Sequence, residues 1–216
     1  MADAAEASAT PAAAEAAAGF LAPSPARPMR VVLLGPPNAG KGTQAAMLSA
    51  KLGVPSISTG EMLRREAESG TPLGLRVKAI MDSGGLVDDD TMAAVVRERL
   101  RQADAAGFVL DGYPRTLAQA ETLAGILAAA DAPLHAVLLI SVPEEQLVRR
   151  ALARGRFDDR EDVIRERLRV YREKTEPLIG YYSGLGLLRE IDGDRPVEEV
   201  GCQLLAALEA QHSRLL

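Results

Sequence analysis

The chain has 216 residues, of which 47% are hydrophobic and 25% are charged, and its formal net charge is −5; these values suit one globular domain with a filled core. The excess of acidic residues argues against a general nucleic-acid or membrane-surface binder, and no apolar run reaches the roughly 18 residues of a membrane span. Because Cys202 is the only cysteine, an internal disulfide and a cysteine-based zinc site are excluded, which fits a reducing, cytoplasmic compartment.

Residues 1–28 differ in composition from the rest, because they are rich in alanine and proline and carry three acids. A transit peptide would be rich in arginine and poor in acids, and a signal peptide needs a basic start and a longer apolar block. We therefore predict a disordered tail over residues 1–28 and a folded domain over residues 29–216. Met29 directly precedes the first strand-like run, so a translation start at that residue is an alternative hypothesis.

From Met29 onward, short apolar runs alternate with longer amphipathic segments. Strands are predicted over residues 30–34, 108–110, 136–140 and 187–191. Helices are predicted over residues 41–52, about 91–106, 116–130, 143–154, 161–182 and 196–210. This alternation, with near-continuous apolar strands, indicates an α/β fold whose parallel sheet is covered by helices on both faces. Ligands on such folds bind at the carboxyl ends of the strands.

Residues 58–87 break the alternation, because they contain two helical patterns with no strong strand between them. Ser58 precedes Glu61 by three residues, which is a capping-box spacing and predicts a helix start at about Gly60. Pro72 can begin the second helix in its first turn, and the pair Gly84–Gly85 can end it. We therefore predict a small helical insert at the edge of the sheet, close to the glycine-rich loop at residues 35–43.

Residues 35–43, GPPNAGKGT, directly follow the first predicted strand and open the first predicted helix. The glycines let successive backbone N–H groups point inward as an anion-binding nest, and Lys41 can reach the outer phosphates. An ordinary glycine-rich turn does not explain a lysine at that place, so we predict a nucleotide-phosphate site. The usual pattern has Ser or Thr directly after the lysine, whereas here Gly42 intervenes and the hydroxyl arrives at Thr43.

A second motif, Asp111-Gly-Tyr-Pro-Arg115, follows the predicted strand at residues 108–110. A carboxylate at a strand end beside a phosphate loop is well placed to orient hydrated Mg²⁺, and an arginine four residues later can bind a phosphate through two parallel hydrogen bonds. Taken alone, the motif is also compatible with a plain turn that carries a surface arginine.

Basic residues are concentrated near the C-terminal third of the chain. Ten of the 25 lie between residues 149 and 174: Arg149, Arg150, Arg154, Arg156, Arg160, Arg165, Arg167, Arg169, Arg172 and Lys174. Acidic residues interleave with them and no aromatic stacking platform is present, which favours a focused polyphosphate site over nucleic-acid binding. Arg149, Arg160, Arg165, Arg169 and Arg172 are expected to lie on solvated helix faces.

Taken together, these segments resemble the adenylate kinases, a family of nucleoside monophosphate kinases. The resemblance is carried by the loop at residues 35–43, the motif at residues 111–115, and five further segments: STGEMLR at 58–64, the pair Arg150 and Arg154, RFDD at 156–159, TEPLIGYY at 175–182 and DGDRP at 192–196. It runs from Met29 to about residue 208. Asn38 stands where the family most often has glycine, and Asn tolerates positive φ better than most residues.

The resemblance implies a P-loop three-layer sandwich around a five-stranded parallel sheet, with residues 58–87 as the insert that binds the monophosphate and a short lid at residues 154–160. It implies that Mg²⁺ arrives with ATP, that Asp111 contacts it through water, and that no residue ligates metal directly and no zinc is held. Expected ATP-binding residues are Asn38, Ala39, Gly40, Lys41, Gly42, Thr43, Arg150, Arg154 and Arg195. Expected AMP-binding residues are Thr59, Arg64, Gly85, Leu86, Val87, Gly112, Tyr113, Pro114, Arg115, Gln119, Arg156 and Arg167. Expected catalytic residues are Lys41, Arg115, Arg154, Arg156, Arg167, Asp158 and Asp159.

The implied reaction is ATP + AMP ⇌ 2 ADP, which maintains adenine nucleotide balance, in a monomer that binds neither nucleic acid nor membrane. The nearest alternative is a UMP/CMP kinase on the same scaffold. Those relatives typically have Ala in place of Thr59 and Asn near Gln119, so both positions favour AMP here. An alternative of another class is a nucleotide sensor without turnover, against which the retention of Lys41, Arg115 and the lid arginines argues.

Overall fold

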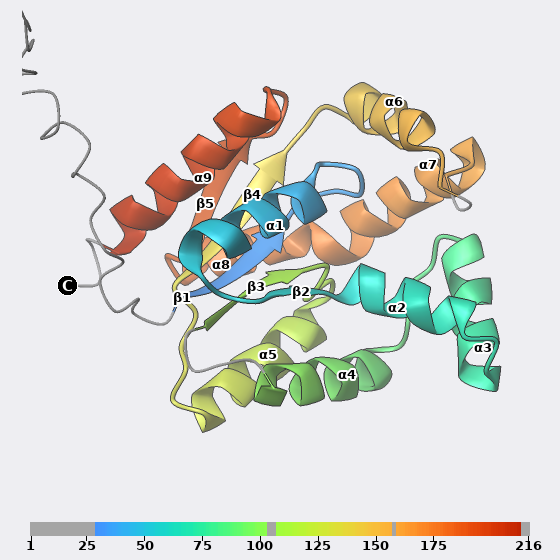
Figure 1. Cartoon of the computed structure of the whole chain (residues 1–216), viewed down its shortest axis with the longest axis horizontal. Coiled ribbons are helices and arrows are strands. Elements are labelled where there is room, and N and C mark those ends of the chain that lie inside the picture. The colour runs from blue at the N-terminus through green and yellow to red at the C-terminus, as the bar shows by residue number, and fades with distance from the viewer. Residues whose placement is uncertain (1–28, 103–106, 157–158, 213–216) are drawn as a thin grey trace, which may run out of the picture.

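A computed structural model describes residues 29–102, 107–156 and 159–212 of the chain (Figure 1). The tail predicted over residues 1–28 lies outside these ranges. No helix within them is long and apolar enough to cross a membrane.

Five parallel strands form one sheet in the order β2-β3-β1-β4-β5. The strands are β1 (Met29–Leu34), β2 (Ser56–Ser58), β3 (Gly107–Asp111), β4 (Ala136–Ser141) and β5 (Leu188–Asp192). The predicted α/β class with a five-stranded parallel sheet is confirmed. Four of the strands begin and end within about one residue of the apolar runs, because a strand covered on both faces is apolar at nearly every position.

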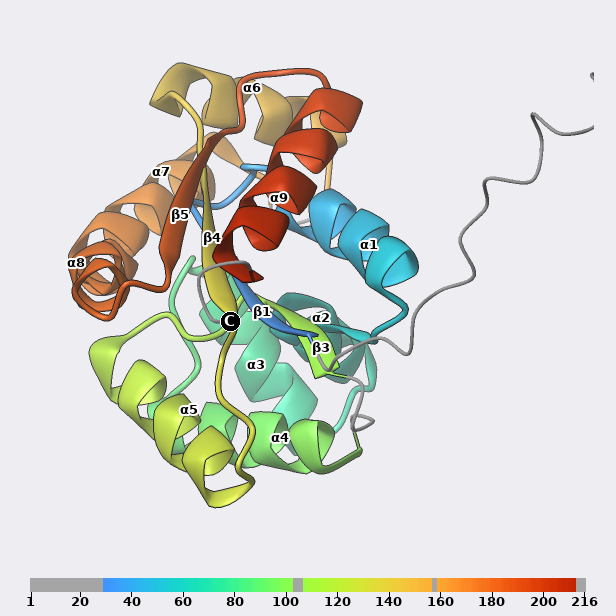
Figure 2. The same ribbon diagram turned by 90° about the vertical axis from the view of Figure 1, so that its left-hand side faces the viewer.

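Helices cover both faces of this sheet, and alternate strand residues contribute to different cores. Val31 and Leu33 of β1 pack with residues of α1 (Lys41–Leu52), α6 (Glu144–Arg154) and α9 (Val197–His212). Val32 and Leu34 pack on the opposite face, together with residues of α4 (Asp89–Gln102) and α5 (Leu117–Ala129). Figures 1 and 2 show α1 and α9 on one side of the sheet and α4 and α5 on the other. The three layers follow from side-chain alternation along each strand.

The helical insert consists of α2 (Thr59–Glu68) and α3 (Pro72–Asp82), and it lies between β2 and α4. The Ser58 hydroxyl accepts the Glu61 backbone N–H at 3.4 Å, so the predicted capping residue begins the first helix. In the second helix the Thr71 hydroxyl accepts the Gly74 N–H at 2.9 Å and Pro72 occupies the first turn. Both helix starts therefore come from local sequence signals.

The prediction of a single helix over residues 161–182 is wrong. The structure has α7 (Glu161–Val170), a π-helical turn (Tyr171–Thr175) and α8 (Pro177–Gly184). The Glu176 N–H donates to the Tyr171 carbonyl five residues earlier, at 2.9 Å. Proline at position 177 has no N–H to continue the ladder, and its ring crowds the preceding turn, so the helix widens before it.

Candidate functional site

A cavity of about 770 Å³ opens at the carboxyl ends of β1, β2 and β3, where Leu34, Ser58 and Asp111 form part of its wall. Its lining contains most of the site residues predicted from the sequence: Asn38, Gly40, Lys41, Gly42, Thr43, Thr59, Arg64, Gly85, Leu86, Val87, Gly112, Pro114, Arg115, Gln119, Arg150, Arg154, Arg156 and Arg167. Four predicted residues are not in the lining: Ala39, Tyr113, Asp159 and Arg195. Asp158 lies outside the described residues.

The loop between β1 and α1 takes a conformation that its glycines and Asn38 allow. Gly35 has φ +145°, and a Cβ on it would lie 2.6 Å from the Ile140 carbonyl oxygen, so no larger residue fits. Gly40 has φ +96° and Asn38 has φ +70°, both in the left-handed region. Asn38 therefore accommodates the turn for which the family commonly uses glycine, as the tolerance of Asn for positive φ predicts.

Lys41 begins α1 and turns its ammonium back over the loop. Its Nζ donates to the carbonyls of Gly35 and Pro36, each at 2.8 Å. Burial lowers the pKa of Lys41 to about 8; the Asp111 carboxylate opposes this shift and the positive charges of Arg115 and Arg154 add to it. A half-buried cation that donates to two carbonyls is stabilised by an added anion, such as a phosphate.

Gly42, which displaces the hydroxyl by one position, lies beside the carboxylate at the end of β3. A Cβ on Gly42 would stand 3.6 Å from Oδ2 of Asp111. Asp111 is itself buried, and its Oδ2 accepts the Ser58 hydroxyl at 3.4 Å. A larger residue at position 42 would extend its side chain toward this carboxylate, whereas glycine leaves the surroundings of Asp111 open.

Two arginines, Arg64 and Arg115, converge near Gly60, on the other side of the cavity from the loop at residues 35–43. A Cβ on Gly60 would lie 3.4 Å from one guanidinium nitrogen of Arg64 and 3.9 Å from one of Arg115. Burial lowers the pKa of Arg115, against the opposing effect of Asp111 and with a further contribution from Arg167. Two guanidinium groups this close repel one another, so the pair is suited to a multiply charged anion between them.

Three hydrogen bonds hold the backbone and the Nε of Arg115 in place. Its Nε donates to the Gly112 carbonyl at 2.8 Å, its backbone N–H donates to Gln119 Oε1 at 2.7 Å, and its carbonyl accepts the Thr175 hydroxyl at 2.9 Å. Thr175 is buried in the π-helical turn and lines the cavity. The likeness of residues 175–182 to the family was noted from the sequence, but the role of Thr175 was missed, since no local pattern links it to a residue 60 positions earlier.

The lid segment between α6 and α7 is organised around one buried carboxylate. Asp159, whose side chain is 1% exposed, accepts two hydrogen bonds from the Arg154 guanidinium at 2.9 and 2.7 Å. It also accepts the Arg156 backbone N–H at 3.0 Å and lies 3.9 Å from Arg167. Burial alone would raise the pKa of Asp159, but the bonds from Arg154 and Arg156 outweigh it and lower that pKa.

Arg167 also joins this segment to the insert. Its guanidinium donates to the Met81 carbonyl near the end of α3 at 3.4 Å. Arg167 of α7 thus contacts both the insert and the lid segment that the sequence predicts.

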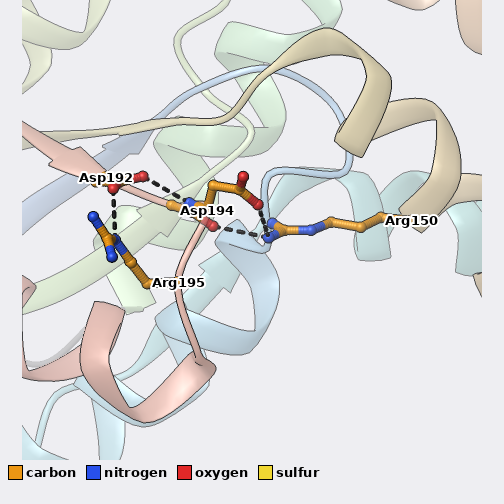
Figure 3. A network of polar contacts seen from close by, with 5 residues as sticks. Arg150, Asp192, Asp194 and Arg195 are labelled. Carbon is orange, nitrogen blue, oxygen red and sulfur yellow. Dashed lines mark hydrogen bonds and ion pairs between the residues drawn. The ribbon is translucent and has the colours of Figure 1, made fainter.

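The remaining predicted arginines lie where the β5–α9 loop meets α6 (Figure 3). Arg150 donates to the Gly193 carbonyl at 2.9 Å and lies 3.4 Å from Asp194. Arg195 pairs with Asp192 at 2.8 Å and points away from Arg150, and its side chain does not line the cavity. Tyr113 is buried in the core that contains residues of α4 and α5.

Comparisons with known proteins agree on one family. The family model described as adenylate kinase matches residues 33–187. The chain is 55% identical over 181 residues to an adenylate kinase of Nocardia farcinica, covering 83% of this chain and 99% of that protein. It is 50% identical over 188 residues to an adenylate kinase of Thermobifida fusca, covering 85% and 100%, and 50% identical over 182 residues to one of Thermus thermophilus, covering 82% and 96%.

Proposed function

The chain belongs to the adenylate kinase family, and we propose that it transfers the terminal phosphoryl group of ATP reversibly to AMP, giving two ADP. It is a phosphotransferase of the nucleoside monophosphate kinase class. The observation that carries the choice of reaction is that one cavity has two separate cationic ends, the Lys41 loop and the Arg64–Arg115 pair. A single phosphate site would suit a nucleotide hydrolase, whereas two facing sites suit transfer between two nucleotides.

We assign ATP to the loop side of the cavity. The backbone N–H groups of residues 38–43 and the ammonium of Lys41 would bind its phosphates, with the base directed toward Arg150 and the loop at residues 192–196. AMP is assigned to the insert side, where Arg64 and Arg115 would bind its α-phosphate and Thr59, Val87 and Gln119 would face its nucleoside. Arg154, Arg156 and Arg167 would then contact the phosphoryl group in transfer.

Positioning and charge neutralisation supply most of the rate of such a transfer, because the transition state is loose and needs little covalent help. Six cations, Lys41, Arg64, Arg115, Arg154, Arg156 and Arg167, line the cavity and would surround the phosphates of the two nucleotides. Closing the short lid at residues 154–160 over the cavity, together with the insert at residues 58–87, would exclude water and prevent hydrolysis of ATP. Asp159, and Asp158 beside it in the sequence, would hold the lid in position.

Mg²⁺ is proposed to enter with ATP. Within the described residues, no three His, Cys, Asp or Glu side chains gather as a metal-binding group, and Asp111 is a single carboxylate beside the open position at Gly42. This donor set fits an ion that keeps its waters and is bound mainly by phosphate oxygens. When bound, the ion would neutralise phosphate charge, and Asp111 would accept hydrogen bonds from its water shell. We further propose that the protein acts as a monomer in the cytoplasm and maintains adenine nucleotide balance.

The test is a coupled assay that offers AMP, CMP, UMP and GMP side by side with ATP. AMP is expected to be strongly preferred. Preference for CMP or UMP would instead establish the UMP/CMP kinase alternative, and ATP binding without turnover of any acceptor would establish a nucleotide sensor.

A further inference from the structure

Asp89, the first residue of α4, receives hydrogen bonds from two side chains far along the chain. Gln119 donates from Nε2 to Oδ1 at 2.7 Å, across 30 positions. The Thr116 hydroxyl donates to Oδ2 at 3.1 Å, across 27 positions. Helices α4 and α5 lie side by side (Figure 1), and these bonds join the start of one to the start of the other. No pattern in the sequence singles out Asp89 among its neighbours Asp88 and Asp90.

The bonds fix which way the Gln119 amide points. Its Oε1 accepts the Arg115 backbone N–H at 2.7 Å, while its nitrogen faces the Asp89 carboxylate, which can only accept. Turning the amide over would set oxygen against carboxylate and N–H against N–H, so two attractive contacts would become repulsive. Gln119 is 2% exposed, and in such a buried place this preference is strong.

One amide hydrogen of Gln119 and one lone pair of its oxygen remain after these bonds are made. Gln119 lines the cavity, so both can face a bound base as a donor beside an acceptor. Adenine presents the complement, a ring N1 acceptor next to an exocyclic amine. Hypoxanthine and guanine carry a hydrogen on N1 and a carbonyl in place of that amine, and therefore oppose both groups.

We propose that Asp89 is a positioning residue that sets the base preference of the acceptor site by locking the Gln119 amide. The inference rests on the proposed function, since it takes AMP as the nucleotide beside Gln119. Asp89 itself touches no substrate in this scheme. Its carboxylate matters because it cannot donate, a property that asparagine does not share.

The experiment compares kcat/KM for AMP with kcat/KM for IMP at saturating ATP, in the unaltered protein and in Asp89→Asn. Asparagine can donate or accept, so one of the two contacts that fix the amide no longer has a set direction, and the AMP:IMP ratio is expected to fall about tenfold, within the range for a good bidentate base contact. KM for ATP is expected to stay within about twofold of the starting value, since Asp89 is not on the ATP side.

Asp90→Asn is the matched control, because it removes the same charge from the same first turn of α4, at an exposed position beside the half-buried Asp89, and should leave the ratio unchanged. If Asp89→Asn does not fold, Asp89→Ser is measured instead, with the same expectation, because serine suits a helix start but is too short to hold the amide. Equal losses for AMP and IMP, or an equal change in Asp90→Asn, would overturn the proposal. Failure of the proposed function would appear differently, as poor use of AMP by the unaltered protein.

Discussion

Two groups of cations line the cavity, and they differ in whether they form ion pairs with carboxylates. We call Lys41, Arg64 and Arg115 the floor of the cavity, and the arginines around residues 154–160 its lid side. Lys41, Arg64 and Arg115 have no carboxylate within ion-pair distance in the described parts of the chain, and Lys41 bonds to carbonyls instead. On the lid side, Arg154 is paired with buried Asp159 and Arg150 with Asp194. The floor is therefore ready to receive phosphate without giving up an ion pair. In the proposed function, Arg154 and Arg150 would exchange a carboxylate for a phosphate when the nucleotides bind, and this exchange suits a segment that opens and closes.

The largest effect expected from this contrast is at Lys41. Lys41→Met removes a cation that forms no ion pair with a carboxylate of the described residues and can therefore bind phosphate fully. The value of kcat should fall by about 10²–10³-fold, the range seen when one preorganised charge-stabilising group is lost. Steady-state assays in the direction of ADP formation measure it. Lys51→Met, on the exposed last turn of the same helix, is the control and should change kcat less than twofold. Unchanged turnover in Lys41→Met would remove Lys41 from the mechanism.

Arg64→Ala should come next in size. Loss of a charge-assisted hydrogen bond to phosphate is worth about 1.5–3 kcal/mol, so KM for AMP should rise about 10- to 100-fold while KM for ATP changes little. The adjacent Arg65→Ala is the control, because the Arg65 side chain is 77% exposed and forms its ion pair with Glu61 one turn earlier in α2. Equal effects at positions 64 and 65 would mean that the insert senses overall charge and has no defined phosphate site.

Because of the lowered pKa of Lys41, the affinity for ATP should depend on pH. Free Lys41 loses its proton above a pKa of about 8, and a bound phosphate raises that pKa because it stabilises the ammonium. The complex therefore holds more protons than the free protein above pH 8, and ATP affinity should fall as pH rises, by up to about tenfold per pH unit. Calorimetry between about pH 7 and pH 9.5 measures this, a window above the phosphate titration near pH 6. In Lys41→Arg the slope should vanish, since arginine stays charged.

The sequence predicts the floor better than it predicts the supports around it, because the floor is encoded locally. The loop at residues 35–43 follows one apolar run and begins one helix, so its glycines and Lys41 can be located from neighbouring residues alone. The bonds from Thr175 to Arg115 and from Gln119 to Asp89 join distant segments, and only the packed fold brings them together. The break before Pro177 did have a local signal, but the amphipathic pattern on both sides outweighed it.

The smallest expected effect tests the lid side. Asp159→Asn leaves Arg154 without its carboxylate, and the free energy of unfolding should fall by about 1–2 kcal/mol, less than for a fully buried pair, because the Arg154 side chain is 33% exposed. In a chain of this size that corresponds to a Tm lower by about 4 °C, which differential scanning calorimetry resolves. Asp162→Asn is the control, since its side chain is 74% exposed and its pair with Arg160 spans 3.5 Å.

The sign of the pH effect separates an ion pair from mere packing at Asp159. Its pKa is lowered in the folded protein, so the pair stabilises the fold above the ordinary carboxyl pKa and is lost as pH falls through the lowered value. The difference in Tm between Asp159→Asn and the unaltered protein should therefore shrink as the solution is acidified from pH 7. A difference that stays constant with pH would mean that Asp159 contributes by shape alone.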